Sequence, residues 1–211
     1  MAGGKKNKKK KGSGRRLSLT ERRRREQVQE LQRQARKLMM AHRWPIREVV
    51  INDTWQEAQL ASIVVCRERE DGQLAAAMFL VDLGCMGVKD TFANSALNWD
   101  HYTRLRDAVG GEHAGEAIEC SPQMAVKIIE EAVAWGQRFG FEPPALFAVS
   151  KLLFKGVEPG DEAVPVGHDG MPVFSPGPED DIYAIQAKLE GLVGPEGYLY
   201  QPPPWLQDDL A

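Results

Sequence analysis

Two stretches of this 211-residue chain carry the side chains whose types and spacing could do chemistry. The first is the N-terminal arm, residues 1–43, which contains 16 Lys and Arg against 3 Glu and has a net charge of +13. The second is the stretch 82–91, which places carboxylates, a thiol and an amine close together around two glycines. Residues 44–211 have a net charge of −16, so a basic arm precedes an acidic body. This asymmetry indicates a polyanionic partner for the arm.

The chemistry that the arm could do is the binding of phosphate groups. Arginine guanidinium groups match phosphate oxygens in a bidentate geometry, and phosphates are the commonest cellular polyanions. No aromatic residue interleaves with the basic ones, so the composition indicates contact with phosphates rather than with bases. The residues predicted to bind nucleic acid, with ribosomal RNA as the leading candidate, are Lys8, Lys9, Lys10, Lys11, Arg15, Arg16, Arg22, Arg23, Arg24, Arg25, Arg33, Arg36 and Lys37. The alternatives are a solubilising tail, a helix lying on the protein's own acidic body, and contact with an anionic membrane surface.

The stretch 82–91 could support nucleophilic catalysis. The candidate catalytic residues are Asp82, Cys85, Lys89 and Asp90. A cysteine nucleophile needs a neighbouring base, and the candidates are His101 and His113, neither at an informative spacing. In the structural alternative, Asp82 caps the amides of a turn, Cys85 packs as a small apolar residue, and Lys89 pairs with an acidic neighbour.

Metal and cofactor sites have little support in the sequence. The histidines are scattered, with no HxxxH or HxH spacing, and no cysteines are paired at ligand spacing. Asp180-Asp181 could meet His168-Asp169 around a hard cation, but helix capping and turn chemistry explain the same four residues. The chain also lacks the P-loop, dinucleotide-binding and nucleophile-elbow motifs. We therefore expect no metal and no cofactor.

The elements that must position these residues follow from hydrophobic periodicity and turn signals. A capping box at Ser18 begins a basic helix, and Ser121-Pro122 begins a core helix. Gly72 closes a hairpin between two apolar strands. Strands are predicted at 46–51, 60–69, 73–83 and 198–200, helices at 99–109, 121–139, 145–154 and 182–193, a second hairpin pairing 163–166 with 171–174, and loops at 84–91 and 110–120.

The basic helix has a narrow apolar stripe. The stripe consists of Val28, Leu31, Ala35, Leu38 and Met39. Such a pattern predicts a helix that docks by one edge and shows its arginines to solvent. The resulting domain organisation is a disordered Lys-rich tail at 1–16, a basic helix at 17–43, a compact α+β domain at 44–201 with a mainly antiparallel sheet packed by helices, and a Pro-rich acidic tail at 202–211.

The segment FLVDLGCMGVKDTF, residues 79–92, resembles the central signature of a family of uncharacterised bacterial proteins. Four further segments fit that family's pattern, at 64–67, 139–143, 169–172 and 175–181. The resemblance covers about residues 46–200 and leaves out the arm. It implies that these residues form one domain and draws attention to the loop 82–91, but it implies no activity.

Composition restricts the class of protein. A chain with 43% hydrophobic residues can bury a core, and no run of 18 apolar residues predicts a membrane span. The basic start lacks the apolar segment of a secretory signal. Three cysteines far apart in sequence predict reduced thiols and a cytoplasmic location.

These observations predict a non-enzymatic RNA- or ribosome-binding protein that is anchored by its arm. Its acidic body could take a protein partner. The two alternatives are an enzyme of unknown reaction with its site at 82–91, and a protein-interaction scaffold whose arm folds onto its own body.

Overall fold

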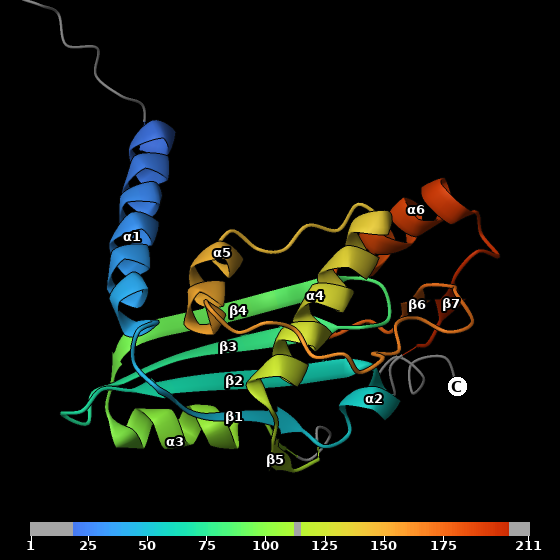
Figure 1. Ribbon diagram of the computed structural model, residues 1–211. Coiled ribbons are helices and arrows are strands. Elements are labelled where there is room, and N and C mark those ends of the chain that lie inside the picture. The colour runs from blue at the N-terminus through green and yellow to red at the C-terminus, as the bar shows by residue number, and fades with distance from the viewer. Residues whose placement is uncertain (1–18, 112–114, 203–211) are drawn as a thin grey trace, which may run out of the picture.

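The computed structural model describes residues 19–111 and 115–202, which form a five-stranded antiparallel sheet with helices on both faces (Figure 1). The strand order is β4-β3-β2-β1-β5. The strands are β1 (Ile46–Asn52), β2 (Leu60–Glu68), β3 (Leu74–Asp82), β4 (Gly87–Leu97) and β5 (Ala117–Glu119). A separate parallel pair consists of β6 (Val173–Phe174) and β7 (Leu199–Tyr200). The predicted α+β class with a mainly antiparallel sheet is thus confirmed.

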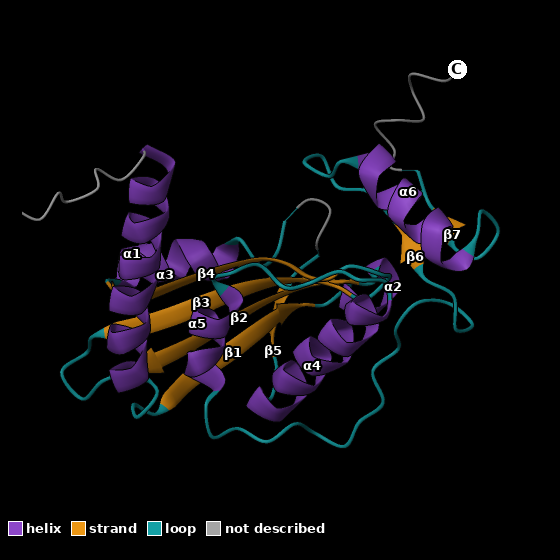
Figure 2. Cartoon of the chain, turned by 90° about the horizontal axis from the view of Figure 1, so that it is seen from above, coloured by secondary structure: helices purple, strands orange, loops and turns teal. Residues whose placement is uncertain are grey.

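Helices cover the two faces of the sheet unequally. They are α1 (Leu19–Ala41), α2 (Trp55–Ala58), α3 (Trp99–Asp107), α4 (Pro122–Arg138), α5 (Phe147–Ser150), the 3₁₀ turn η1 (Lys151–Phe154) and α6 (Ile182–Val193). Helices α1, α4 and α5 lie on one face, and α3 lies on the other (Figures 1 and 2). Among the described residues, none of these helices combines the length and the apolar character needed to cross a membrane.

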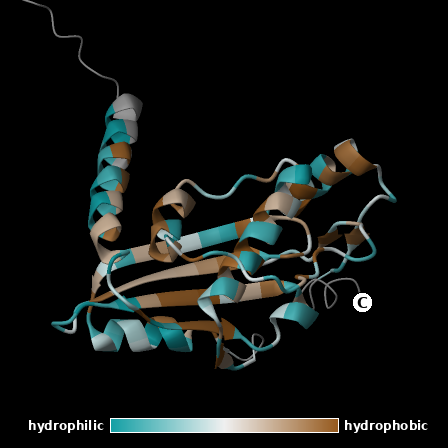
Figure 3. Ribbon diagram, viewed as in Figure 1, coloured by the Kyte–Doolittle hydropathy of each residue, from teal (hydrophilic) through white to brown (hydrophobic). Residues whose placement is uncertain are grey.

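Side chains of the inner strands are buried on both faces. Ile63 and Val65 of β2 belong to the core beneath α1, α4 and α5, whereas Val64 and Cys66 pack with Tyr102 of α3. This alternation follows from the two-residue period of a strand. Figure 3 shows the contrast between the hydrophobic strands β1 and β2 and the mostly hydrophilic α1.

Local sequence signals set several element boundaries. Ser121 accepts a hydrogen bond from the N–H of Met124 at 3.1 Å and so caps α4. Asn98 caps α3 in the same way, through the N–H of His101 at 2.9 Å. Gly72 takes a positive φ of 83° in the turn between β2 and β3.

Three sequence predictions of secondary structure were wrong. Residues 171–174 do not form a hairpin with 163–166, because β6 pairs in parallel with β7 from the far end of the chain. The stretch 84–91 is only partly a loop, since β4 begins at Gly87. Residues 117–119 were expected in a loop but form β5, which pairs with β1. In the first and third cases the pairing partner is distant in sequence and leaves no local turn signal.

Candidate nucleic-acid interface

Helix α1 docks on the body through one side of its C-terminal half. Leu38 and Ala41 are 1% and 0% exposed, and Leu31 and Ala35 pack partly buried against the same core. The helix contacts β4, α5 and η1 there. Val28 and Met39, which the sequence placed in the same stripe, remain 45% and 47% exposed. Only part of the apolar stripe therefore holds the helix.

Several basic side chains of α1 face away from this contact. A helical turn of about 3.6 residues places Arg22 and Arg36 on the side opposite Leu38. Every described side chain between residues 22 and 30 is exposed, and the helix extends beyond the sheet in both views (Figures 1 and 2). Of the predicted nucleic-acid ligands, the structure exposes Arg22, Arg23, Arg25, Arg33, Arg36 and Lys37. Lys8, Lys9, Lys10, Lys11, Arg15 and Arg16 lie outside the described residues, as does the side chain of Arg24.

The cations of α1 are not neutralised by the acidic body. Within the described chain, the only ion pair made by a basic side chain of α1 joins Arg33 to Glu30 of the same helix, with Nε and Oε2 3.1 Å apart. Both side chains of that pair are exposed to solvent, so the pair contributes little to stability. Arg22, Arg25 and Lys37 thus keep their charge available for another anion.

A buried arginine fixes the point where the arm joins the body. Arg67 of β2 is 6% exposed, and its guanidinium donates to two backbone carbonyls. Its Nη1 donates to the Trp44 oxygen, just after α1, at 2.5 Å, and its Nε donates to the Leu153 oxygen of η1 at 2.7 Å. Burial lowers the pKa of Arg67 from its usual value. A cation within an apolar strand is the one sequence signal for this role, and the sequence predictions do not include it.

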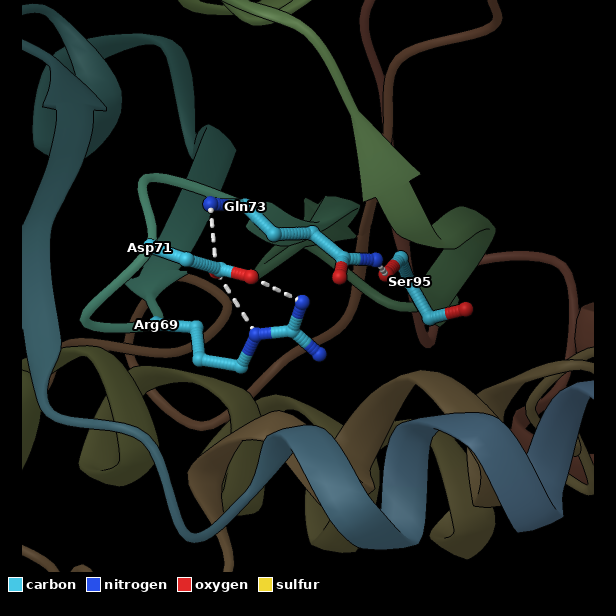
Figure 4. A network of polar contacts seen from close by, with 4 residues as sticks. All are labelled: Arg69, Asp71, Gln73 and Ser95. Carbon is cyan, nitrogen blue, oxygen red and sulfur yellow. Dashed lines mark hydrogen bonds and ion pairs between the residues drawn. The ribbon is translucent and has the colours of Figure 1, made fainter.

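A polar network on the β2–β3 turn lies beside this junction (Figure 4). Arg69 Nε donates to Asp71 Oδ1 at 2.7 Å, and the same oxygen accepts from the Gln73 N–H at 3.2 Å. The Gln73 side chain donates to the Ser95 carbonyl of β4 at 3.1 Å. The Arg69 guanidinium also stacks over Trp44, 5.3 Å from the ring centre. The turn, β4 and the end of the arm are therefore held together.

The candidate catalytic stretch 82–91 consists of the end of β3, a turn at residues 83–86 and the start of β4. Asp82 is buried at the end of β3, and its Oδ1 accepts from the N–H groups of Cys85 at 2.7 Å and Met86 at 3.0 Å. Burial raises the pKa of Asp82, against the effect of these two bonds. A Cβ on Gly136 of α4 would lie 2.9 Å from the Gly87 nitrogen, so α4 packs directly on the turn.

The other candidate side chains of this stretch have different surroundings and different partners. Cys85 is buried with Trp135 in an apolar cluster, and burial raises the pKa of its thiol. Lys89 pairs with Asp180, which tethers β4 to the segment before α6. Asp90 is exposed and accepts from the Thr91 N–H at 2.7 Å.

The structure supplies no described histidine base next to Cys85. His101 lies on α3, at the other end of the sheet from the β3–β4 turn (Figure 1), and His113 lies outside the described residues. The arrangement therefore matches the structural alternative for each of Asp82, Cys85 and Lys89.

The four residues that the sequence offered as ligands for a hard cation make other contacts. Asp180 is the partner of Lys89, and Asp181 caps α6 by accepting from the Ala184 N–H at 3.1 Å. His168 lies beside Asp169 in an exposed turn. Within residues 19–111 and 115–202, no group of three His, Cys, Asp or Glu side chains could hold a metal ion.

No protein-family model, curated protein or solved structure matches this chain. The resemblance of residues 79–92 to a bacterial family therefore stays a prediction.

Proposed function

We propose that this protein is a non-enzymatic RNA-binding protein that holds RNA phosphates through the exposed cations of α1 and the basic segment before it, with the ribosome as its source of RNA. The orientation of α1 carries this proposal. Its apolar side docks on the body, whereas its described arginine side chains are exposed and pair with no carboxylate of the body in the described chain. A helix that served only to neutralise the acidic body would place its cations on that body.

The charge of the body limits where RNA can bind. Residues 44–211 carry a net charge of −16, and many of their carboxylates are exposed. These groups repel phosphate, so contact is confined to α1 and its N-terminal extension. Arginine is suited to this contact because its planar fork binds two phosphate oxygens at once. The proposal includes a cytoplasmic location, where the three thiols stay reduced.

A charge-removal experiment tests this function. The double variant Arg22→Gln, Arg25→Gln removes two exposed cations from the same side of α1. Its matched control is Arg104→Gln, Lys155→Gln, which removes two exposed cations from the body. Binding to ribosomes is measured by co-sedimentation, and binding to a labelled single-stranded RNA by fluorescence anisotropy over a series of salt concentrations.

The arm variant should bind RNA roughly 10-fold more weakly than the full chain. The slope of log affinity against log salt should also fall by about 0.7 for each lost phosphate contact. The control should match the unaltered protein in both respects. Equal losses in the two variants would mean that net charge, rather than α1, governs binding, and no binding by the unaltered chain would reject the function.

A further inference from the structure

Five polar side chains form a line along the outer side of α1, which we call the outer line. Successive members are three or four residues apart, so a helical turn of about 3.6 residues places all of them on the side opposite the buried Leu38. The members are Arg22, Arg25, Gln29, Gln32 and Arg36, and all five are exposed. The described carboxylates of α1, Glu26 and Glu30, lie off this line.

The side chains of the outer line are free to bind a ligand. Within the described chain, the ion pair of α1 joins Arg33 to Glu30, and Gln34 donates to the same carboxylate at 3.3 Å. Neither contact uses a member of the outer line. The helix extends beyond the sheet in both views, so its outer side is open to a large partner (Figures 1 and 2).

The outer line has cations at its two ends and amides between them. Arg25 and Arg36 lie about 16 Å apart along the axis, because each residue of a helix advances about 1.5 Å. They therefore reach phosphates that are well separated on a nucleic acid. Gln29 and Gln32 lie between them, and each amide both donates and accepts hydrogen bonds.

This order of groups matches the minor groove of an RNA duplex. That groove is wide and shallow, with the phosphates of the two strands along its sides and 2′-hydroxyls and base edges on its floor. Arginines at the ends of the outer line suit the phosphates of both strands, and the amides between them suit the 2′-hydroxyls, which donate and accept hydrogen bonds.

The same helix is poorly suited to a single strand. Proteins that bind single-stranded RNA stack its bases on aromatic side chains. The 23 residues of α1 include no Phe, Tyr or Trp. A duplex needs no such stacking, because its bases are already stacked on one another and its backbone presents the contacts.

We propose that the RNA bound by α1 is double-stranded and that the outer line lies across its minor groove, with arginines on phosphates of both strands and glutamines on 2′-hydroxyls. This inference rests on the proposed function, because it specifies the form of RNA that the same helix binds. It predicts a preference for an RNA duplex over both a single strand and a DNA duplex.

The test measures the binding of the full chain to three labelled probes of equal length by fluorescence anisotropy: an RNA duplex, an oligouridylate and a DNA duplex. The first variant is Arg25→Gln, Arg36→Gln, which removes a cation from each end of the outer line. Its matched control is Arg23→Gln, Lys37→Gln, which removes two exposed cations of α1 that lie off the line. The second variant, Gln29→Ala, Gln32→Ala, leaves the charge unchanged. Circular dichroism and thermal unfolding verify that each variant is folded.

The full chain should bind the RNA duplex most tightly of the three probes. Arg25→Gln, Arg36→Gln should weaken that binding roughly 10-fold, whereas the control pair should keep most of the affinity. Gln29→Ala, Gln32→Ala should weaken binding to the RNA duplex about 5-fold and leave binding to the DNA duplex unchanged, because DNA lacks the 2′-hydroxyl.

Three results would overturn the inference and leave α1 as a ligand of RNA phosphates. They are equal losses in the two arginine and lysine pairs, an oligouridylate that binds as tightly as the RNA duplex, and a DNA duplex that binds as tightly as the RNA duplex. If the full chain binds neither RNA probe, the proposed function itself fails.

Discussion

Cys85 lies in an apolar cluster with Trp135, Phe139 and Phe174, and its side chain is fully buried. Burial and the nearby Asp82 carboxylate both raise the pKa of the thiol, because each disfavours the thiolate. A nucleophilic cysteine needs the opposite environment, with a neighbouring cation or base and access to substrate. The environment of Cys85 therefore favours a packing role for its side chain over a nucleophilic one.

Thiol alkylation tests this interpretation. Burial raises the pKa of Cys66 to about 12 and that of Cys120 to about 11. At about pH 8 the thiolate fraction is therefore small, and iodoacetamide should label partly exposed Cys120 slowly and leave Cys66 and Cys85 unlabelled until urea unfolds the chain. Labelling of Cys120 should accelerate about 10-fold per pH unit until the pH approaches its pKa, because the thiolate fraction rises in that proportion. Mass spectrometry assigns each site, and fast labelling of Cys85 in the folded protein near neutral pH would restore the nucleophile hypothesis.

At the scale of elements, the junction between α1 and β1 depends on Arg67. Its guanidinium links the Trp44 carbonyl to the Leu153 carbonyl of η1, so one side chain ties the end of the arm to the helical layer. No described carboxylate pairs with Arg67, and the two carbonyls satisfy part of its charge. Loss of such a donor leaves buried carbonyls without a partner.

Substitution of Arg67 should therefore cost far more than substitution of Arg69. Arg67→Gln should lower the free energy of unfolding by about 2–3 kcal/mol, because charged hydrogen bonds to buried acceptors are lost. Arg69→Gln breaks a solvent-exposed pair with Asp71 and should cost less than about 1 kcal/mol. Urea denaturation of the two variants measures both values, and equal effects would show that Arg67 does not hold the junction.

The sequence predicted these elements where the signal was local. Ser121 and Gly72 marked a helix start and a turn, and the structure has both. The pairing of β6 with β7 could not be read in the same way, because two short strands meet in parallel after a long connection. The same reason applies to the site: composition predicted the basic arm, but only the fold brings the Arg67 guanidinium of β2 to the end of that arm.

At the scale of the whole molecule, the arm belongs to both the charged surface and the core. Its outward side carries the positive charge, while Leu38 and Ala41 lie in the main hydrophobic cluster with Ile63 and Ile128. Removal of residues 1–43 would therefore remove core side chains together with the RNA-binding cations. A shorter truncation separates the two roles, because the described side chains between residues 22 and 30 are exposed.

Two truncations should behave differently. A chain that lacks residues 1–26 keeps Leu31, Ala35, Leu38 and Ala41, so it should unfold at the same urea concentration as the full chain and yet bind RNA much more weakly. A chain that lacks residues 1–43 should lose about 3 kcal/mol or more of unfolding free energy, since burial of one leucine alone contributes about 2–5 kcal/mol by comparison with alanine. Urea titration and RNA anisotropy on the same preparations separate stability from binding. If both truncations are equally stable, α1 is not part of the core, and if the shorter truncation retains full RNA affinity, the contact lies in the part of the helix that begins at residue 27.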